Sequence, residues 1–205
     1  MSRVLLGLTG YRRVGKSTLA SILSERHGYV CVHPADGMKA GVLAYLTRAG
    51  ISEDEARDMV YGEAKDVRHP RLPGPVRALM EQAGQAWGMA GPASGWTLGV
   101  ELSRPEVIRA PKVVVESIVW EAPQLLGMGG LVARVTRPGV EAQGRESDVF
   151  VDTIEPHFTV HNDGDTRQLE ELADELHQQA RDLADSPFRL TPEPTLWQAA
   201  DVAAP

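Results

Sequence analysis

Residues 10–17, GYRRVGKS, have the types and spacing of a phosphate-binding loop, G-x-x-x-x-G-K-[ST]. The two glycines let the backbone curl, so that its N–H groups point at phosphate oxygens. Lys16 would then reach the β- and γ-phosphates, and the Ser17 hydroxyl would ligate Mg²⁺. The pattern predicts that ATP and Mg²⁺ bind at Gly10, Tyr11, Arg12, Arg13, Val14, Gly15, Lys16, Ser17 and Thr18.

The segments on either side of this loop decide between a phosphate cradle and an ordinary glycine-rich turn with a capping serine. Val4–Leu8 is a short apolar run typical of a buried parallel strand. Lys16–His27 has apolar residues at helical spacing and is followed by Gly28, a good helix stop. A strand before the loop and a helix after it favour the phosphate cradle.

The rest of the chain alternates predicted strands with predicted helices, which indicates a parallel α/β sheet. Polar residues 137–152 are expected to be a mobile loop. Further strands are predicted at 29–33, 112–116, 131–135 and 157–160, and helices at 37–48, 52–60, 76–87, 120–126 and after 165. We expect one domain over residues 1–185 and a loose tail over 186–205.

Composition limits the possible classes of protein. The 205 residues carry a net charge of -7 and one cysteine, Cys31. A disulfide within the chain and a cysteine-based zinc site are therefore excluded, and the six histidines lack metal-ligand spacing. The sequence has no signal-peptide pattern and no apolar run of membrane-spanning length, so we expect a cytoplasmic protein with no membrane contact. Any contact with DNA would need a local basic patch.

Two other classes of nucleotide-binding protein fit the sequence less well. The dinucleotide-binding pattern G-x-G-x-x-G does not follow the first strand, and no N-K-x-D stretch is present to read guanine. A short chain with several arginine-bearing loops favours a small kinase.

Six further segments, taken in order, resemble the phage-type P-loop kinases related to deoxynucleoside monophosphate kinases. They are HPADGMK (33–39), YGEAKD (61–66), RLPGPVRALMEQAGQAWG (71–88), the VVVE strand (113–116), GGLVARVTRPG (129–139) and HNDGD (161–165). The resemblance covers nearly the whole chain apart from the tail. It implies a three-layer α/β P-loop nucleoside-kinase-like fold with a parallel sheet and a mobile lid at about 137–152.

The resemblance also implies roles for two carboxylates. Asp36, just after the second predicted strand, would orient or deprotonate the attacking hydroxyl, or else serve only as a helix N-cap. Glu116, at the end of the VVVE strand, would hold the hydration shell of Mg²⁺ together with Ser17.

Three arginines and one asparagine match other positions of the family. Arg77 corresponds to an arginine that contacts the acceptor, although a plain surface arginine explains it nearly as well. Arg137 and Arg145 flank the predicted lid and would bring positive charge to the transferring phosphoryl group, and Arg145 is equally compatible with a solvated loop charge. Asn162 belongs to a turn that resembles the adenine side of the family's nucleotide site, although N-D-G is a common turn.

Two departures from the family concern the acceptor. Ile118 stands where the family usually has an arginine two positions after the third-strand acid, which weakens the case for a free monophosphate acceptor. Five arginines would form a local basic rim suited to a polyanion: Arg12, Arg13, Arg68, Arg71 and Arg77. One phage branch of the family, the 5-hydroxymethyluracil DNA kinases, modifies bases already in DNA, and the sequence resembles it at least as well.

The sequence therefore predicts an ATP- and Mg²⁺-dependent kinase acting on a deoxynucleotide. The favoured acceptor is 5-hydroxymethyldeoxyuridine in phage DNA, and the location would then be the host cytoplasm. A deoxynucleoside monophosphate kinase acting on free dNMP is the near alternative, and a regulatory ATPase is a third. Trp87, Trp96 and Trp120 are interpreted as packing residues, with base stacking an alternative for Trp96.

Overall fold

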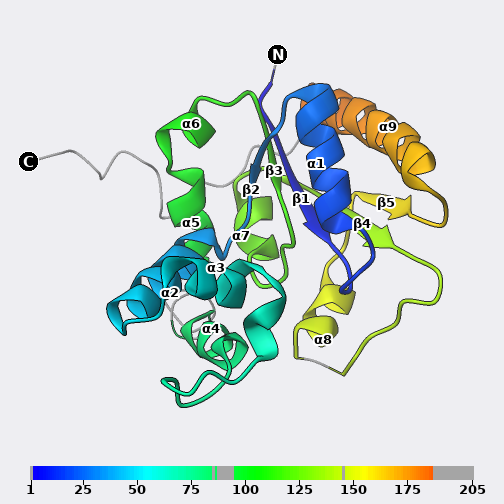
Figure 1. Cartoon of the computed structure of the whole chain (residues 1–205). Helices are drawn as coiled ribbons and strands as arrows, with labels where there is room; N and C mark the ends of the chain where they lie inside the picture. The colour runs from blue at the N-terminus through cyan, green and yellow to red at the C-terminus, as the bar shows by residue number, and fades with distance from the viewer. Residues whose placement is uncertain (1, 85, 87–94, 145, 187–205) are drawn as a thin grey trace, which may run out of the picture. The chain divides into compact units, whose positions relative to one another are not determined.

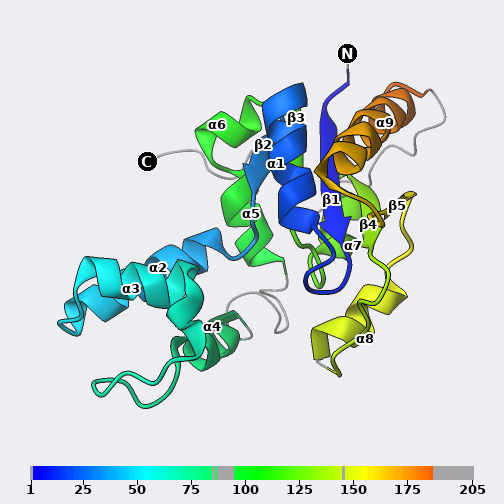
Figure 2. The same cartoon turned by 45° about the vertical axis from the view of Figure 1, so that its right-hand side comes forward.

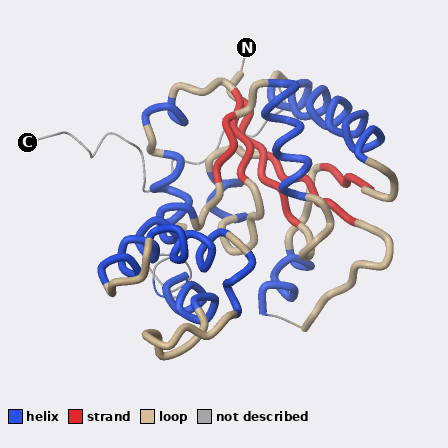
Figure 3. Tube along the Cα trace, viewed as in Figure 1, coloured by secondary structure: helices blue, strands red, loops and turns tan. Residues whose placement is uncertain are grey.

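The computed structural model describes residues 2–84, 86, 95–144 and 146–186 of the chain. Its strands form one all-parallel sheet in the order β2-β3-β1-β4-β5 (Figure 3). The bounds of these strands are β1 Val4–Thr9, β2 Val30–Val32, β3 Lys112–Val115, β4 Leu131–Thr136 and β5 Phe158–His161. The parallel sheet predicted from the alternating strands and helices is confirmed.

Helices cover both faces of this sheet (Figure 1). Helices α1 (Lys16–His27) and α9 (Thr166–Ala184) pack side by side on one face, where Leu6 and Leu8 of β1 are fully buried. The opposite face of β1 carries Gly7, and a Cβ there would lie 3.1 Å from Leu125 of helix α7 (Ala122–Gly127). The predicted three-layer α/β fold with a parallel sheet is confirmed.

The connections that leave β1 and β3 diverge at the carboxyl ends of these strands. These strands are neighbours, but the helix after β1 lies on one face and the helix after β3 on the other. Ligands of open parallel sheets bind where the connections diverge in this way. The loop after β1 is the predicted phosphate-binding loop, and the residue after β3 is Glu116.

The chain divides into two compact units, residues 1–34 with 102–205, and residues 35–101. The first holds the sheet, helix α6 (Pro105–Ile108) and helix α8 (Glu146–Thr153), and the second is helical. Its elements are α2 Asp36–Arg48, α3 Glu53–Tyr61, the 3₁₀ helix η1 Glu63–Asp66, α4 Val76–Gly84 and α5 Trp96–Leu102, whose last residue begins the other unit. Leu46, Ala56, Val60 and Val76 are fully buried in a core of this unit's own. Figure 2 shows the same elements from a second side.

Most predicted elements are confirmed with small shifts of their bounds. The predicted loop at 137–152 is wrong in its second half, because α8 begins at Glu146. Helices α5 and α6 were not predicted, since their apolar runs are too short to show a period. Trp87, Arg145 and the tail from 187 onward lie outside the described residues. Among the described helices, none combines the length and apolar character that crossing a membrane requires.

Candidate active site

The backbone of the loop after β1 requires glycine at both fixed positions. Gly10 has φ +135° and Gly15 has φ +102°, in the region that L side chains rarely adopt. A Cβ on Gly10 would meet the carbonyl oxygen of Val135, and one on Gly15 would meet the side-chain amide of Asn162. The chain therefore curls tightly here and enters α1 at once, with the Leu19 N–H donating to the Gly15 carbonyl at 2.9 Å.

Lys16 lies across the loop that it follows. Its Nζ donates to the carbonyl oxygens of Gly10 and Tyr11, each at 2.7 Å. Burial lowers the pKa of Lys16 to about 8, although the nearby Glu116 carboxylate acts in the opposite direction. A partly desolvated ammonium group beside a tightly curled loop at the start of a helix is suited to binding phosphate.

Ser17 and Glu116 are 99 positions apart in the sequence but are in contact in the fold. The Ser17 hydroxyl donates to Oε1 of Glu116. The Glu116 N–H donates to the Val32 carbonyl at 2.8 Å, which continues the sheet ladder and fixes the carboxylate at its edge. Ser117 then turns the chain sharply with φ +63°.

Adjacent hydroxyl and carboxylate oxygens are the ligand types that Mg²⁺ takes beside nucleotide phosphates. Ser17 and Glu116 therefore fit the predicted metal site. Within the described residues no three His, Cys, Asp or Glu side chains gather as a metal cage.

Asn162 contacts the loop in a way that the sequence did not reveal. It is 5% exposed, and its Nδ2 donates to the Val14 carbonyl at 2.8 Å. Its backbone N–H donates to the Thr136 carbonyl at 2.9 Å, continuing the pairing of β4 with β5. The Asn162 side chain thus supports the predicted phosphate-binding loop through the Val14 carbonyl. Its predicted contact with adenine stays a prediction.

Helix α8 is joined to the same loop and to β4. The Tyr11 hydroxyl donates to Asp152 at 2.7 Å, and this bond raises the pKa of Tyr11. Arg134 of β4 donates through Nη2 to the carbonyl of Val151 at 2.9 Å and to that of Ile154. These contacts were missed because nothing in the sequence pairs Tyr11 with a residue 141 positions away.

Asp148 of α8 is a second acidic residue near the loop. It is 6% exposed, and its Oδ2 accepts from the Gln143 N–H at 2.7 Å. Its charge also acts to raise the pKa of Lys16. Asp148 and Asp152 lie one helical turn apart, so α8 presents two carboxylates on the side of the phosphate-binding loop.

The remaining predicted residues of this unit that the structure describes are exposed. Arg12, Arg13 and Thr18 of the loop are exposed, and Arg13 has the left-handed φ of +66°. Arg137 is exposed in the segment after β4. Arg145, its predicted partner in the lid, lies outside the described residues.

Ile118, which stands where the family named in the sequence comparison usually has an arginine, is fully buried. Its N–H donates to the Leu8 carbonyl at 2.9 Å, and a Cβ on Gly7 would lie 3.2 Å from its Cγ1. Ile118 therefore packs between α7 and β1. At this position the chain contributes packing to the core, where a guanidinium would need a buried partner.

Several buried polar atoms have no hydrogen-bond partner among the described residues. Thr9 of β1 is paired in register with Arg134 of β4, so both side chains lie on the α7 face. Buried side-chain atoms that lack a hydrogen-bond partner in the described structure include Thr9 Oγ1, Arg134 Nε, Trp120 Nε1 and Gln124 Oε1. The Trp120 ring also packs on the Phe150 ring of α8, with ring centroids 5.8 Å apart, which agrees with the predicted packing role of Trp120.

Asp36 lies in the second unit as the first residue of α2. The N-cap of α2 is Ala35, with no side-chain capping bond, so the N-cap interpretation of Asp36 is wrong. The half-exposed carboxylate accepts from Nζ of Lys39 at 3.1 Å. Glu101, 3% exposed, accepts from the Gly37 N–H at 2.8 Å and so anchors the start of the helix.

Two of the arginines in the predicted basic rim have protein partners. Arg77 forms a two-pronged pair with Asp66, through Nε to Oδ1 and through Nη2 to Oδ2 at 2.8 Å. This pair raises the pKa of Arg77 further. Arg71 donates through Nη1 to the Gly50 carbonyl. Arg68 is exposed and forms no hydrogen bond or ion pair with the described residues.

No protein-family model and no curated protein matches the chain. Among solved structures, the chain is similar to the crystal structure of TT1252 from Thermus thermophilus. That alignment has 21% identity, a TM-score of 0.43, and covers 89% of this chain and 99% of the other. The likeness is too weak to carry an argument about function.

Proposed function

We propose that the protein is an ATP-dependent kinase that phosphorylates the hydroxymethyl group of 5-hydroxymethyldeoxyuridine in DNA. The observation that carries the kinase proposal is the geometry after β1. There a glycine-bounded loop opens a helix, Lys16 lies across it, and Ser17 contacts Glu116 of the neighbouring strand. Positioning and electrostatic stabilisation supply most of the catalysis in phosphoryl transfer, and these residue types supply both.

In the proposed reaction the acceptor hydroxyl oxygen forms a bond to the γ-phosphorus, and the bond from that phosphorus to the bridging oxygen breaks, releasing ADP. Lys16 and the loop N–H groups hold the phosphates, and Asp36 receives the hydroxyl proton. Ser17 and Glu116 would hold Mg²⁺, which when bound neutralises negative charge on the phosphates.

Two observations on where the chain does and does not offer positive charge support the acceptor proposal. Ile118 is buried, so that position offers no cation to a monophosphate dianion. Arg12, Arg13 and Arg68 are exposed, as cations for a polyanion would be. Thymine in ordinary DNA carries a C5 methyl group in the major groove, and a hydroxymethyl group there is an accessible nucleophile.

A free deoxynucleoside monophosphate is the second candidate acceptor. It is favoured by the engagement of Arg71 and Arg77 within the protein, which leaves fewer cations for DNA, and by the net charge of -7. A regulatory ATPase without an acceptor gives no role to the half-exposed Asp36.

The test offers γ-labelled ATP separately with 5-hydroxymethyluracil DNA, with the same DNA containing thymine, and with each dNMP. The proposal predicts label on the hydroxymethylated DNA alone, and none with the Lys16→Ala variant. Conversion of a dNMP to its diphosphate without labelled DNA would establish the second candidate. ATP hydrolysis that no acceptor stimulates would favour the regulatory ATPase.

A further inference from the structure

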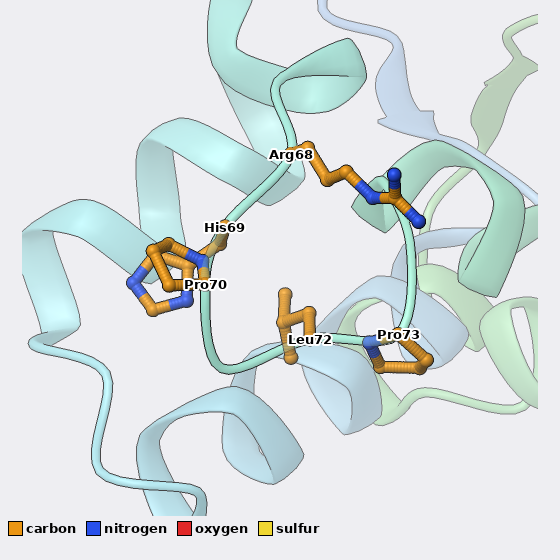
Figure 4. A pocket seen from close by; sticks show the side chains of 5 residues that line it. All are labelled: Arg68, His69, Pro70, Leu72 and Pro73. Carbon is orange, nitrogen blue, oxygen red and sulfur yellow. The ribbon is translucent and has the colours of Figure 1, made fainter.

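The loop between η1 and α4, residues 67–75, surrounds an open hollow in the helical unit. The hollow has a volume of about 420 Å³ and is lined by Arg68, His69, Pro70, Leu72 and Pro73. Figure 4 shows the Arg68 side chain reaching from one limb of the loop toward the other, with Leu72 pointing into the loop. The volume falls within the range of small-ligand pockets.

Contacts from both sides hold this loop in shape. The Arg71 guanidinium donates to the Gly50 carbonyl, and the Arg71 N–H donates to Nδ1 of His69 at 3.1 Å. The Leu72 N–H donates to the His69 carbonyl at 3.0 Å, and the Leu72 side chain packs on the helical core. Pro70, Pro73 and Pro75 each restrict φ. A loop ordered before binding loses little entropy when a ligand arrives.

Arg68 is the charged group of the hollow that remains available. His69 uses Nδ1 to accept from Arg71, and its Nε2 lies 3.4 Å from Oε1 of Glu55. Arg68 is exposed and has no partner among the described residues, as stated above. A guanidinium binds a phosphate through two parallel N–H donors, and phosphate esters are among its best ligands.

We propose that Arg68 and the walls of this hollow bind a sugar-phosphate segment of a DNA strand. The inference rests on the proposed function, since it assigns a contact to the DNA acceptor. The guanidinium would hold one phosphodiester, while Pro70, Leu72 and Pro73 pack against the deoxyribose. An open hollow admits a continuous strand, and a single phosphodiester charge matches a single free arginine.

The probe is a fluorescent duplex oligonucleotide, used with thymine and with 5-hydroxymethyluracil, whose binding is measured over a series of salt concentrations. Arg68→Gln should weaken binding about five- to tenfold near 0.1 M salt and reduce the slope of log K against log salt by about 0.9, the value for one phosphate contact. Arg68→Lys should keep most of the slope. Both DNAs should respond alike, because a backbone contact reads no base.

The matched control is Arg109→Gln, which removes an exposed arginine between α6 and β3, at the amino edge of the sheet. It should leave DNA binding and its salt slope unchanged. ATP affinity should be unchanged in all three variants, which also reports that they are folded.

Equal binding and equal salt slope for Arg68→Gln and the unmodified protein would overturn the inference. So would an equal rise in KM for free dNMP and for DNA in Arg68→Gln, because the contact would then belong to a mononucleotide. A third outcome is possible: Arg68→Gln reduces the salt slope of DNA binding, but the unmodified protein transfers no label to hydroxymethylated DNA. That outcome would retain the Arg68 contact and overturn the proposed function.

Discussion

The two units of the molecule hold their predicted site residues in different ways. Around the phosphate-binding loop the partners are far apart in sequence, 99 residues for Ser17 and Glu116 and 148 for Asn162 and Val14. In the helical unit they are close, three residues for Asp36 and Lys39 and eleven for Arg77 and Asp66. The first arrangement depends on the whole sheet, and the second on a few helical turns.

This difference bears on how rigidly each unit holds its predicted site. Contacts from β4, from Asn162 and from α8 hold the loop after β1 in shape. Exposed ion pairs such as Asp36 with Lys39 contribute little free energy, typically about 0–1 kcal/mol. They can therefore exchange a protein partner for a ligand at small cost. Under the proposed function, the first unit would bind phosphate rigidly and the second would contact the acceptor adaptably.

The largest expected effect is on Lys16. Lys16→Ala should reduce phosphoryl transfer by about 10²- to 10³-fold, because one preorganised phosphate contact is lost. The thermal midpoint should change little, since the desolvation cost of the ammonium group is removed together with its hydrogen bonds to the Gly10 and Tyr11 carbonyls. Steady-state kinetics and thermal melts measure the two effects. Lys112→Ala, at the amino end of β3, is the control, and undiminished turnover by folded Lys16→Ala would contradict the loop assignment.

Asp36→Asn tests the other unit, with an expected loss in transfer of about 10²-fold. ATP affinity should be unchanged, because the carboxylate acts on the acceptor hydroxyl. Asp54→Asn, an exposed acid at the start of α3, is the matched control. If Asp36→Asn lowers ATP affinity as much as it lowers the rate of transfer, the proposed division of roles between the two units is contradicted.

Gly15 and Gly28 lie at the two ends of α1. Replacing each by alanine distinguishes the cost of backbone strain from an effect on the loop after β1. Both have positive φ, but a Cβ on Gly15 would meet Asn162, whereas one on Gly28 has no atom within 4 Å. Gly28→Ala should lower the free energy of unfolding by about 1–2 kcal/mol and leave ATP affinity unchanged. Gly15→Ala should also weaken ATP binding, by about tenfold or more, since strain of that size must be relieved by moving the loop. Calorimetric titration with ATP and chemical denaturation check this pair, and equal ATP affinities would contradict it.

The smallest effect concerns a histidine outside the candidate site. Burial, with the neighbouring His27, Lys112 and Arg181, lowers the pKa of His177 in α9 to about 4. In the unfolded chain this group titrates near 6.5, so the unfolded state binds more protons between pH 6.5 and 4. The free energy of unfolding should therefore fall as pH decreases through that window.

The expected share of His177 in that decrease is on the order of 1 kcal/mol, after allowance for partial solvent screening. His177→Gln should make the dependence shallower between pH 6.5 and 4, measured by denaturant unfolding at each pH, while ATP affinity at pH 7 stays unchanged. An identical pH profile in the variant would contradict the burial of a neutral His177.

The sequence by itself determined the local architecture around the phosphate-binding loop. Strand, loop and helix over residues 4–27 follow from an apolar run, two glycines and a helical period, all of which act between near neighbours. The alternation of strands and helices also determined the parallel three-layer class. The unpredicted α8 shows the limit, because a polar helix of eight residues has little periodic signal.

Only the tertiary structure decided which distant residues meet that loop. It placed Asn162 under Val14 and Asp152 against Tyr11, and it buried Ile118. It also engaged Arg71 and Arg77 within the protein while leaving Arg68 exposed. The physical reason is that such contacts depend on strand order, on the face of the sheet that each residue occupies and on loop geometry. No residue type or spacing along the chain encodes these properties locally.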